Sequence, residues 1–139
     1  MAIQAWRNQY RMITVCVDSY VNGVLNGRLH NPYRDCWIPF QSLTQFLKTM
    51  EETMDEMVFP RAFNETRIFS PSLKPDLACT DDTTPTGKLA TFGLRVLFRQ
   101  NASWQGSISW MEGRQEESFR SVLELILLMD NALTGPRAE

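Results

Sequence analysis

The sequence predicts an α+β protein in which a β-β-α unit occurs twice, forming a four-stranded antiparallel sheet with two helices on one face. A strand-like period of two gives way to a helical period twice along the chain, and the two segments align without a gap. A shift of 79 positions places Asn22, Gly27, Phe40, Ser42 and Met50 on Asn101, Gly106, Phe119, Ser121 and Met129. One unit alone would leave its apolar face in water, whereas two side by side cover it.

The 139 residues are expected to form a single domain. Its first unit is predicted at 12–58 and its second at 89–135, with a flexible connection at 69–88 between them. Prolines at positions 71, 75 and 85 and a run of threonines and aspartates predict that this connection has no regular structure. The role of residues 1–12 stays open at this point.

The first unit begins with a strand in which Ile13, Val15 and Val17 alternate with more polar residues. An Asn-Gly pair at 22–23 predicts a hairpin turn into a second strand, which carries Leu25 and Leu29. The segment from 32 to 39 is rich in turn residues and is interpreted as a loop.

A helical period follows this loop, in the residues Phe40, Leu43, Phe46, Leu47, Met50, Met54 and Met57. Ser42 with Gln45 three residues later resembles a capping box, which predicts a helix that begins near Phe40 or Ser42. The opposite face carries the charged residues Lys48, Glu51, Glu52, Asp55 and Glu56 and is interpreted as solvated.

The second unit repeats the order. Apolar residues alternate through two strands that a turn at Asn101 and Ala102 joins, namely Phe92, Leu94, Val96, Phe98, Trp104 and Ile108. The helical period resumes at Phe119, with Ser121 and Glu124 as a second capping box, and Gly135 predicts the helix end. Because this helix is apolar on more of its circumference than the first, it is expected to lie deep or to contact a partner.

Composition excludes several classes. Hydrophobic residues make up 43% and charged residues 22%, which is typical of a folded globular protein. A net charge of -2 gives no overall attraction to nucleic acid or to anionic lipid. The sequence has neither a run of about 18 apolar residues nor a signal-peptide pattern. We therefore expect a cytoplasmic protein that does not enter a membrane.

The cysteines are odd in number and widely spaced, at Cys16, Cys36 and Cys79. This pattern argues against a disulfide framework and against a zinc site, so three free thiols are predicted. No phosphate-binding loop is present, and neither a cofactor nor a metal is indicated. His30 is the single histidine, and it shares a predicted sheet face with Cys16, which leaves a Cys/His enzyme as the weakest of three functional hypotheses.

One short motif resembles part of a nucleotide-binding signature. Asn101 to Gly106 read N-A-S-W-Q-G, which resembles the D/N-x-S-x-x-G half of the PilZ signature, and Arg7 to Arg11 resemble its R-x-x-x-R half. The resemblance implies cyclic dinucleotide binding, but most of the chain separates the two halves, so a hairpin turn is the preferred interpretation. The β-β-α order also resembles half of an HicB-type antitoxin, an analogy of order alone.

Strand alternation defines the sheet face that no helix is predicted to cover. The residues proposed there as a binding surface are Tyr20, Arg28, His30, Arg95, Arg99 and Ser107. Such a basic face fits a protein partner, or single-stranded nucleic acid that binds by stacking and phosphate contact.

The favoured hypothesis is a small non-enzymatic interaction or regulatory protein that binds a protein partner or a second copy of itself. An accessory or inhibitory protein encoded by a mobile element would fit this description. The alternative is a nucleic-acid-binding protein that uses Arg28, Arg95 and Arg99.

Overall fold

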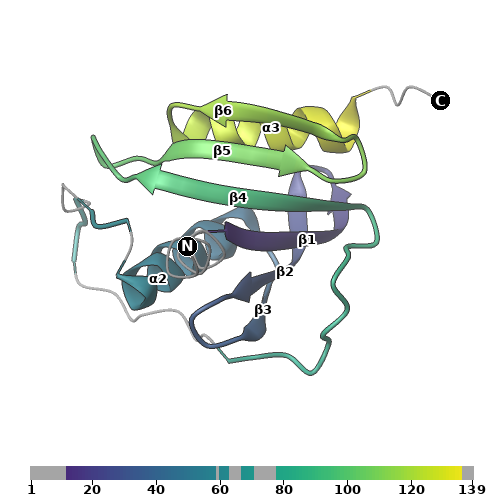
Figure 1. The fold of residues 1–139 in the computed structure, drawn as a ribbon, viewed down its shortest axis with the longest axis horizontal. Helices are drawn as coiled ribbons and strands as arrows, with labels where there is room; N and C mark the ends of the chain where they lie inside the picture. The colour runs from purple at the N-terminus through teal and green to yellow at the C-terminus, as the bar shows by residue number, and fades with distance from the viewer. Residues whose placement is uncertain (1–11, 59, 63–66, 71–77, 136–139) are drawn as a thin grey trace, which may run out of the picture.

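The computed structural model describes residues 12–58, 60–62, 67–70 and 78–135. Their elements are β1 (Met12–Val21), β2 (Val24–Asn31), β3 (Cys36–Phe40), α2 (Leu43–Met57), β4 (Ala90–Phe98), β5 (Gln105–Trp110), β6 (Gln115–Phe119) and α3 (Val122–Thr134). The strands form one antiparallel sheet in the order β3-β2-β1-β4-β5-β6 (Figure 1). Three strands and one helix therefore lie on each side of the central β1–β4 contact.

The α+β class is confirmed, but the predicted four-stranded sheet is wrong, because the structure has six strands. The missed strands, β3 and β6, are the two edges of the sheet and immediately precede the helices. β3 contains Pro39, and β6 has four polar residues before Phe119, so neither shows a clear strand pattern. Proline and charged side chains are typical of edge strands, which have a neighbour on one side only.

The strand pairing on the two sides of the sheet matches position by position under the same shift of 79 residues. Thr14 of β1 pairs with Gly93 of β4, which is its own aligned position. The β1–β2 register shifts between Val17 and Ser19, and the β4–β5 register shifts at the aligned place, between Val96 and Phe98. Each half therefore carries a β-bulge at the same point of its first strand.

A glycine lies opposite the start of each bulge, where the backbones of two neighbouring strands approach closely. Gly27 pairs with Val17, and a Cβ on Gly27 would overlap the backbone carbonyl of Cys16. Gly106 pairs with Val96, and a Cβ there would overlap the carbonyl of Arg95. Only a residue without a side chain fits such a close approach of two backbones.

Both helices begin as the sequence predicted. Ser42 and Ser121 are the N-caps, and their side chains accept hydrogen bonds from the backbone N–H groups of Gln45 and Glu124. Helix α2 begins at Leu43. Phe40 is the last residue of β3 rather than part of the helix, and its side chain lies in the core. Helix α3 ends at Thr134, directly before Gly135. Neither described helix is long and apolar enough to span a membrane.

One hydrophobic core joins both halves, and the two helices pack against the same sheet face. The strands contribute Ile13, Val15, Val17, Leu29, Ile38, Phe40, Phe92, Leu94, Val96, Ile108 and Phe119, and the helices contribute Phe46, Met50, Met54, Leu125 and Met129. Fully burying one such side chain stabilises the fold by about 2 kcal/mol. The predicted inward face is thus correct except at Phe98, which is 51% exposed because it follows the bulge in β4.

Candidate interaction surface

The six residues predicted to share one open face occupy three different places. Tyr20 and Arg99 contact the helices. Arg28 and His30 lie on the opposite, open face of the sheet in the first half. Arg95 and Ser107 lie on the same open face in the second half, where they form a cross-strand pair.

The prediction placed Tyr20 and Arg99 wrongly for one physical reason. Each follows the bulge in its strand, and one extra residue reverses which face the later side chains point to. Simple alternation from Val15 or Val96 cannot detect that reversal. Tyr20 and Arg99 are aligned positions, so the same error occurred once in each half.

On the helix side these two residues make reciprocal connections between the halves. The Tyr20 hydroxyl donates a hydrogen bond of 2.6 Å to Oδ1 of Asp130 on α3. The Arg99 guanidinium donates to Glu51 and Asp55 on α2, and its Nε donates to the Pro60 carbonyl at 2.6 Å. Glu51 is aligned with Asp130, so each half reaches the same point of the other half's helix.

The hydrogen bond to Asp130 also raises the pKa of Tyr20, because ionising the phenol would remove the donor and bring two negative charges together. Arg99 and Tyr20 therefore hold the two halves together on the helix side.

Arg28 is buried on the open face, where it holds the connection between the two halves. Its Nη1 lies 2.9 Å from Oδ2 of Asp18 and 3.6 Å from Oδ2 of Asp82. Its Nη2 donates to the carbonyl oxygens of Thr84 and Thr86, at 2.5 and 3.1 Å. Most of its hydrogen-bonding capacity is therefore used within the chain.

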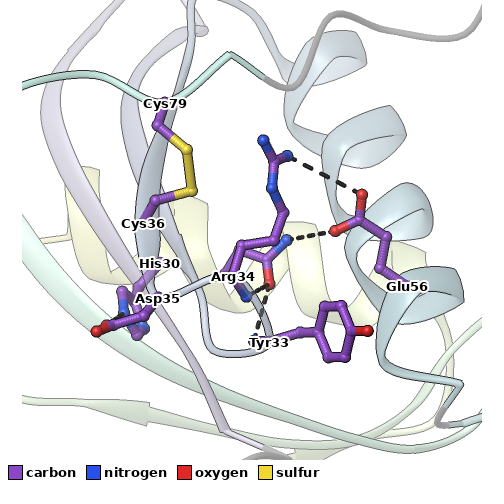
Figure 2. The surroundings of a disulfide bond; sticks show 8 residues. His30, Tyr33, Arg34, Asp35, Cys36, Glu56 and Cys79 are labelled. Atoms are coloured by element: carbon purple, nitrogen blue, oxygen red, sulfur yellow. Dashed lines mark hydrogen bonds and ion pairs between the residues drawn. A yellow bond between two sulfur atoms is a disulfide. The ribbon is translucent and has the colours of Figure 1, made fainter.

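The connection is also attached to the edge of β3. Cys36 and Cys79 form a disulfide, and the backbone N–H of Thr80 donates to the Trp37 carbonyl at 2.8 Å (Figure 2 shows the disulfide). The prediction of three free thiols was wrong, because spacing along the chain does not reveal which cysteines the fold brings together. Residues 78–88, expected to be a flexible connection, therefore contact the first half through a covalent bond and several hydrogen bonds.

Figure 2 also shows the turn between β2 and β3 next to α2. The Asn31 side chain donates to Glu56 at 2.9 Å and accepts from the backbone of Tyr33. Arg34 extends toward the same Glu56 carboxylate. Acidic residues of α2 that the sequence suggested were only solvated thus bind the β2–β3 turn and Arg99.

Cys16 and His30 do not meet as a catalytic pair. Cys16 is fully buried beside Arg28, and this burial raises the pKa of its thiol to about 11, which disfavours the reactive thiolate. His30 pairs with Trp37, and its Nε2 lies 2.9 Å from Oδ1 of Asp35. No hydrogen bond joins Cys16 to His30 in the part of the chain that the structure describes.

In the second half no described connection is bound across the aligned surface, although the side chains of Met12 and Met111 lie over Gly93. We call this surface the second-half open face, and its side chains come from Arg95, Ser107, Ser109, Glu116 and Ser118. Arg95 is exposed, and no ion pair joins it to another described residue. These positions present three serines, Glu116 and the exposed Arg95, and the half-exposed Phe98 lies beyond them after the bulge in β4.

A cleft of about 210 Å³ opens on the other side of β6, between this edge strand and α3. Trp110, Leu128 and Ala132 form its apolar walls, together with Phe92 and Ile108. Gln115, Glu117 and Asn131 provide polar groups at the same cleft. Sequence reasoning missed this site because it missed β6; the alignment of Phe119 with Phe40 was the available signal for a strand before each helix.

The segment from Asn101 to Gly106 forms the hairpin turn between β4 and β5, as the preferred interpretation of this motif predicts. Asn101 and Ala102 have φ angles of 57° and 52°, and Ser103 accepts a hydrogen bond from the first helical N–H of α3 at 2.8 Å. Arg7 and Arg11, the other half of the PilZ-like motif, lie outside the described residues.

Comparison with known proteins gives no relative for this surface. No family model matches the chain, and no curated protein or solved structure matches it significantly.

Proposed function

We propose that this chain is a small non-enzymatic interaction or regulatory protein that binds another protein through the second-half open face. Its two halves, which we infer to be copies of one ancestral unit, would then have separate tasks. The first half is closed by its own connection, and the second half is left for a partner. An accessory or inhibitory role in a mobile element remains compatible with this proposal.

One observation supports the proposal above all: a connection is bound across the open face in the first half, and no described connection is bound across the aligned face in the second. Arg28 donates hydrogen bonds to the carbonyls of Thr84 and Thr86 and forms an ion pair with Asp82, whereas no described connection is bound to its aligned residue, Ser107. The partly or fully exposed hydroxyl groups and one exposed arginine on this sheet face suit a protein contact, in which polar groups exchange water for hydrogen bonds.

Self-association is a separate form of protein contact, and it would use helix α3 rather than the second-half open face. Helix α3 exposes Leu123 and Leu127 on its outer side, at 66% and 56%, and exposed leucines one turn apart are common at contacts between subunits. Light scattering over a range of protein concentrations would detect it.

Nucleic-acid binding is the second candidate and has less support. It relied on three arginines, of which Arg28 and Arg99 are buried in hydrogen bonds within the chain. Arg95 alone remains exposed, which is a small charge for contacting several phosphates. Binding of labelled single-stranded RNA that weakens steeply with salt and is reduced by Arg95→Ala would restore this candidate.

A Cys/His enzyme has the least support, because Cys16 is buried and its thiol pKa is raised to about 11. Alkylation of native Cys16 by iodoacetamide at pH 7 should be far slower than that of a free thiol.

The cytoplasmic location stays a prediction, and the Cys36–Cys79 disulfide is an argument against it. Reducing compartments keep most protein thiols reduced, so a structural disulfide favours an oxidising one. Free thiols can be blocked with an alkylating reagent in the cells that make the protein, and non-reducing electrophoresis then shows whether Cys36 and Cys79 are oxidised there. An oxidised pair would favour an oxidising compartment, and a reduced pair a reducing one.

The test of the proposed function is co-purification from those cells with two charge-matched variants. Arg95→Glu changes the second-half open face, and Lys48→Glu makes the same change on the exposed side of α2. We expect Arg95→Glu to lose a partner that both the wild type and Lys48→Glu retain. Equal retention by both variants would contradict the proposal.

A further inference from the structure

The two edges of the sheet differ in whether a further strand can be added. At the β3 edge, Thr80 already donates a hydrogen bond to the Trp37 carbonyl, which therefore points away from β2. Backbone groups alternate in direction along a strand, so Pro39, two residues on, faces outward as well. Because proline has no N–H, this second outward position cannot donate. The β3 edge is closed by its own chain.

At the β6 edge the aligned positions are Glu116 and Ser118. They pair with Ser109 and Ser107 in the same register that joins Trp37 and Pro39 to His30 and Arg28. The same alternation therefore directs the backbone N–H and C=O groups of Glu116 and Ser118 outward. β6 is the last strand of the sheet, and no described residue pairs with that outer side. An extended segment could form four backbone hydrogen bonds there, about two per outward residue.

The surroundings of β6 indicate what kind of segment would fit. Side chains of an added strand would alternate between the second-half open face and the cleft beside α3. On the cleft side they would meet Trp110 and Leu128 as apolar walls, with Glu117 at the strand edge. On the open side they would meet Glu116 and Ser118.

The charges at the β6 edge favour a bound segment with basic side chains. Glu116 and Glu117 are exposed, and no ion pair links either of them to a described residue. A second copy of β6 would place carboxylates next to carboxylates, which destabilises cross-strand pairs. Lysine or arginine side chains would instead meet opposite charge, and their methylene stems would cover the apolar walls of the cleft.

We propose that the β6 edge binds an extended segment of a partner protein by strand addition, with lysine or arginine side chains against Glu116 and Glu117. The added strand pairs with the outward backbone of Glu116 and Ser118, and its alternate side chains enter the cleft between β6 and α3. This inference depends on the proposed function, because it names the part of the second half where the partner binds and the chemistry of that partner.

The probe for this inference is a phage-displayed library of random ten-residue peptides, selected on the full chain. Enriched peptides are expected to carry lysine or arginine on both faces of the added strand, one toward Glu116 and one toward Glu117, and fluorescence anisotropy then measures their affinity. Ser118→Pro copies the residue that the chain itself uses at the aligned position, Pro39, and removes the outward N–H; Ser118→Ala is its matched control. We expect Ser118→Pro to weaken binding about tenfold, and Ser118→Ala by less than about twofold.

A charge test works even where Ser118→Pro does not fold. The double variant Glu116→Lys Glu117→Lys should weaken the same peptides at least about tenfold in low salt, whereas Glu52→Lys on α2 should leave them unchanged. Peptides that bind Ser118→Pro as well as Ser118→Ala, or that are insensitive to the double variant, would overturn the inference. A dimer of the wild type that Ser118→Pro abolishes would also overturn it, because the occupant would then be a second copy.

The two proposals fail in distinguishable ways. Loss of a cellular partner in Arg95→Glu but not in Ser118→Pro or in the double variant would retain the proposed function and contradict strand addition. Retention in Arg95→Glu, with loss in Ser118→Pro, would support strand addition and restrict the partner to the edge rather than the open face.

Discussion

The first and second halves of the molecule share their interior and differ in what covers their surface. Both place a bulge, a close-packed glycine, a buried phenylalanine and a serine N-cap at aligned positions. Outside the core, residues 78–88 are bound across the open face and edge of the first half, whereas no described connection is bound across those of the second. The comparison teaches that aligned positions which determine the fold are alike in the two halves, whereas aligned surface positions differ.

The contacts between the halves also keep their geometry while their side chains differ. Tyr20 and Arg99 are aligned but chemically different, and each binds a carboxylate on the opposite helix. Leu25 is aligned with Trp104, whose indole Nε1 donates to Glu51 at 3.3 Å, so the second half fills its space with a larger ring. The geometry of the contact is kept while the side chains that make it vary.

The largest expected effect tests whether the two halves contribute equally to the core. Phe40 and Phe119 are buried at aligned positions, so Phe40→Ala and Phe119→Ala should each lower the free energy of unfolding by about 4 kcal/mol. Phe98→Ala, at a half-exposed site, should cost less than about 1 kcal/mol. Urea denaturation measures all three. A cost for one phenylalanine more than about 2 kcal/mol above the other would break the equivalence.

Removing the disulfide tests the feature that distinguishes the halves. Cys36 and Cys79 are 43 residues apart, and a cross-link over a loop of that size contributes about 4 kcal/mol in the chain-entropy model. The variant Cys36→Ser Cys79→Ser should lose about that much and exchange amide hydrogens faster at residues 78–89, with little change in β5 and β6. Adding a reductant should destabilise the wild type but not this variant. Faster exchange of equal size in both halves would contradict the comparison.

Removing the contacts that Arg99 and Tyr20 make with the opposite helices should lower the free energy of unfolding by a smaller amount. The Arg99 side chain is 5% exposed and its partners Glu51 and Asp55 are 41% and 58% exposed, so solvent screens part of the loss. Arg99→Met should therefore cost about 2 kcal/mol, and Tyr20→Phe, which removes one hydrogen bond, about 1 kcal/mol. Thermal denaturation of the two variants and of their combination would measure both. Tyr20→Phe costing more than Arg99→Met would contradict this order.

The smallest effect concerns the helix caps. The Arg120 guanidinium lowers the pKa of Glu124 to about 2, whereas the aligned residue, Gln45, does not titrate. A lowered folded-state pKa contributes stability above the ordinary value of 4.5, and this stability is lost as pH falls through about 2. The difference in melting temperature between the wild type and Glu124→Gln should be small, because the pair is exposed, and should shrink below pH 4.5.

A direct check of this pair is a carboxyl titration followed by NMR. In Arg120→Ala the Glu124 midpoint should move up toward 4.5, the ordinary value. An unchanged midpoint would mean that Arg120 is not the cause.

Local patterns in the sequence were sufficient for the central strands, both N-caps and nearly all of the inward-facing residues. They failed where a feature depends on one irregular residue or on distant contacts. The bulges at Asp18 and Leu97 reversed the faces of Tyr20 and Arg99, and no period reveals a bulge. The edge strands carry proline or glutamates, which a strand with only one neighbour tolerates.

The disulfide and the candidate site were out of reach of sequence patterns for a related reason. Cys36 and Cys79 meet only because the connection folds back on β3, and the cleft exists only once β6 is placed beside α3. A prediction of the binding surface from alternation alone therefore selected Arg95 and Ser107 together with residues that hold the fold, such as Arg28.

The claim that the second half carries the partner surface is tested most directly by site-specific photo-cross-linking in the cells that make the protein. Ser109 and His30 are aligned positions on the open face, one in each half and both partly exposed. A benzoylphenylalanine at Ser109 should give a discrete heavier product, and the same residue at His30 should not. A product from His30 alone, or equal yields from both positions, would contradict the claim.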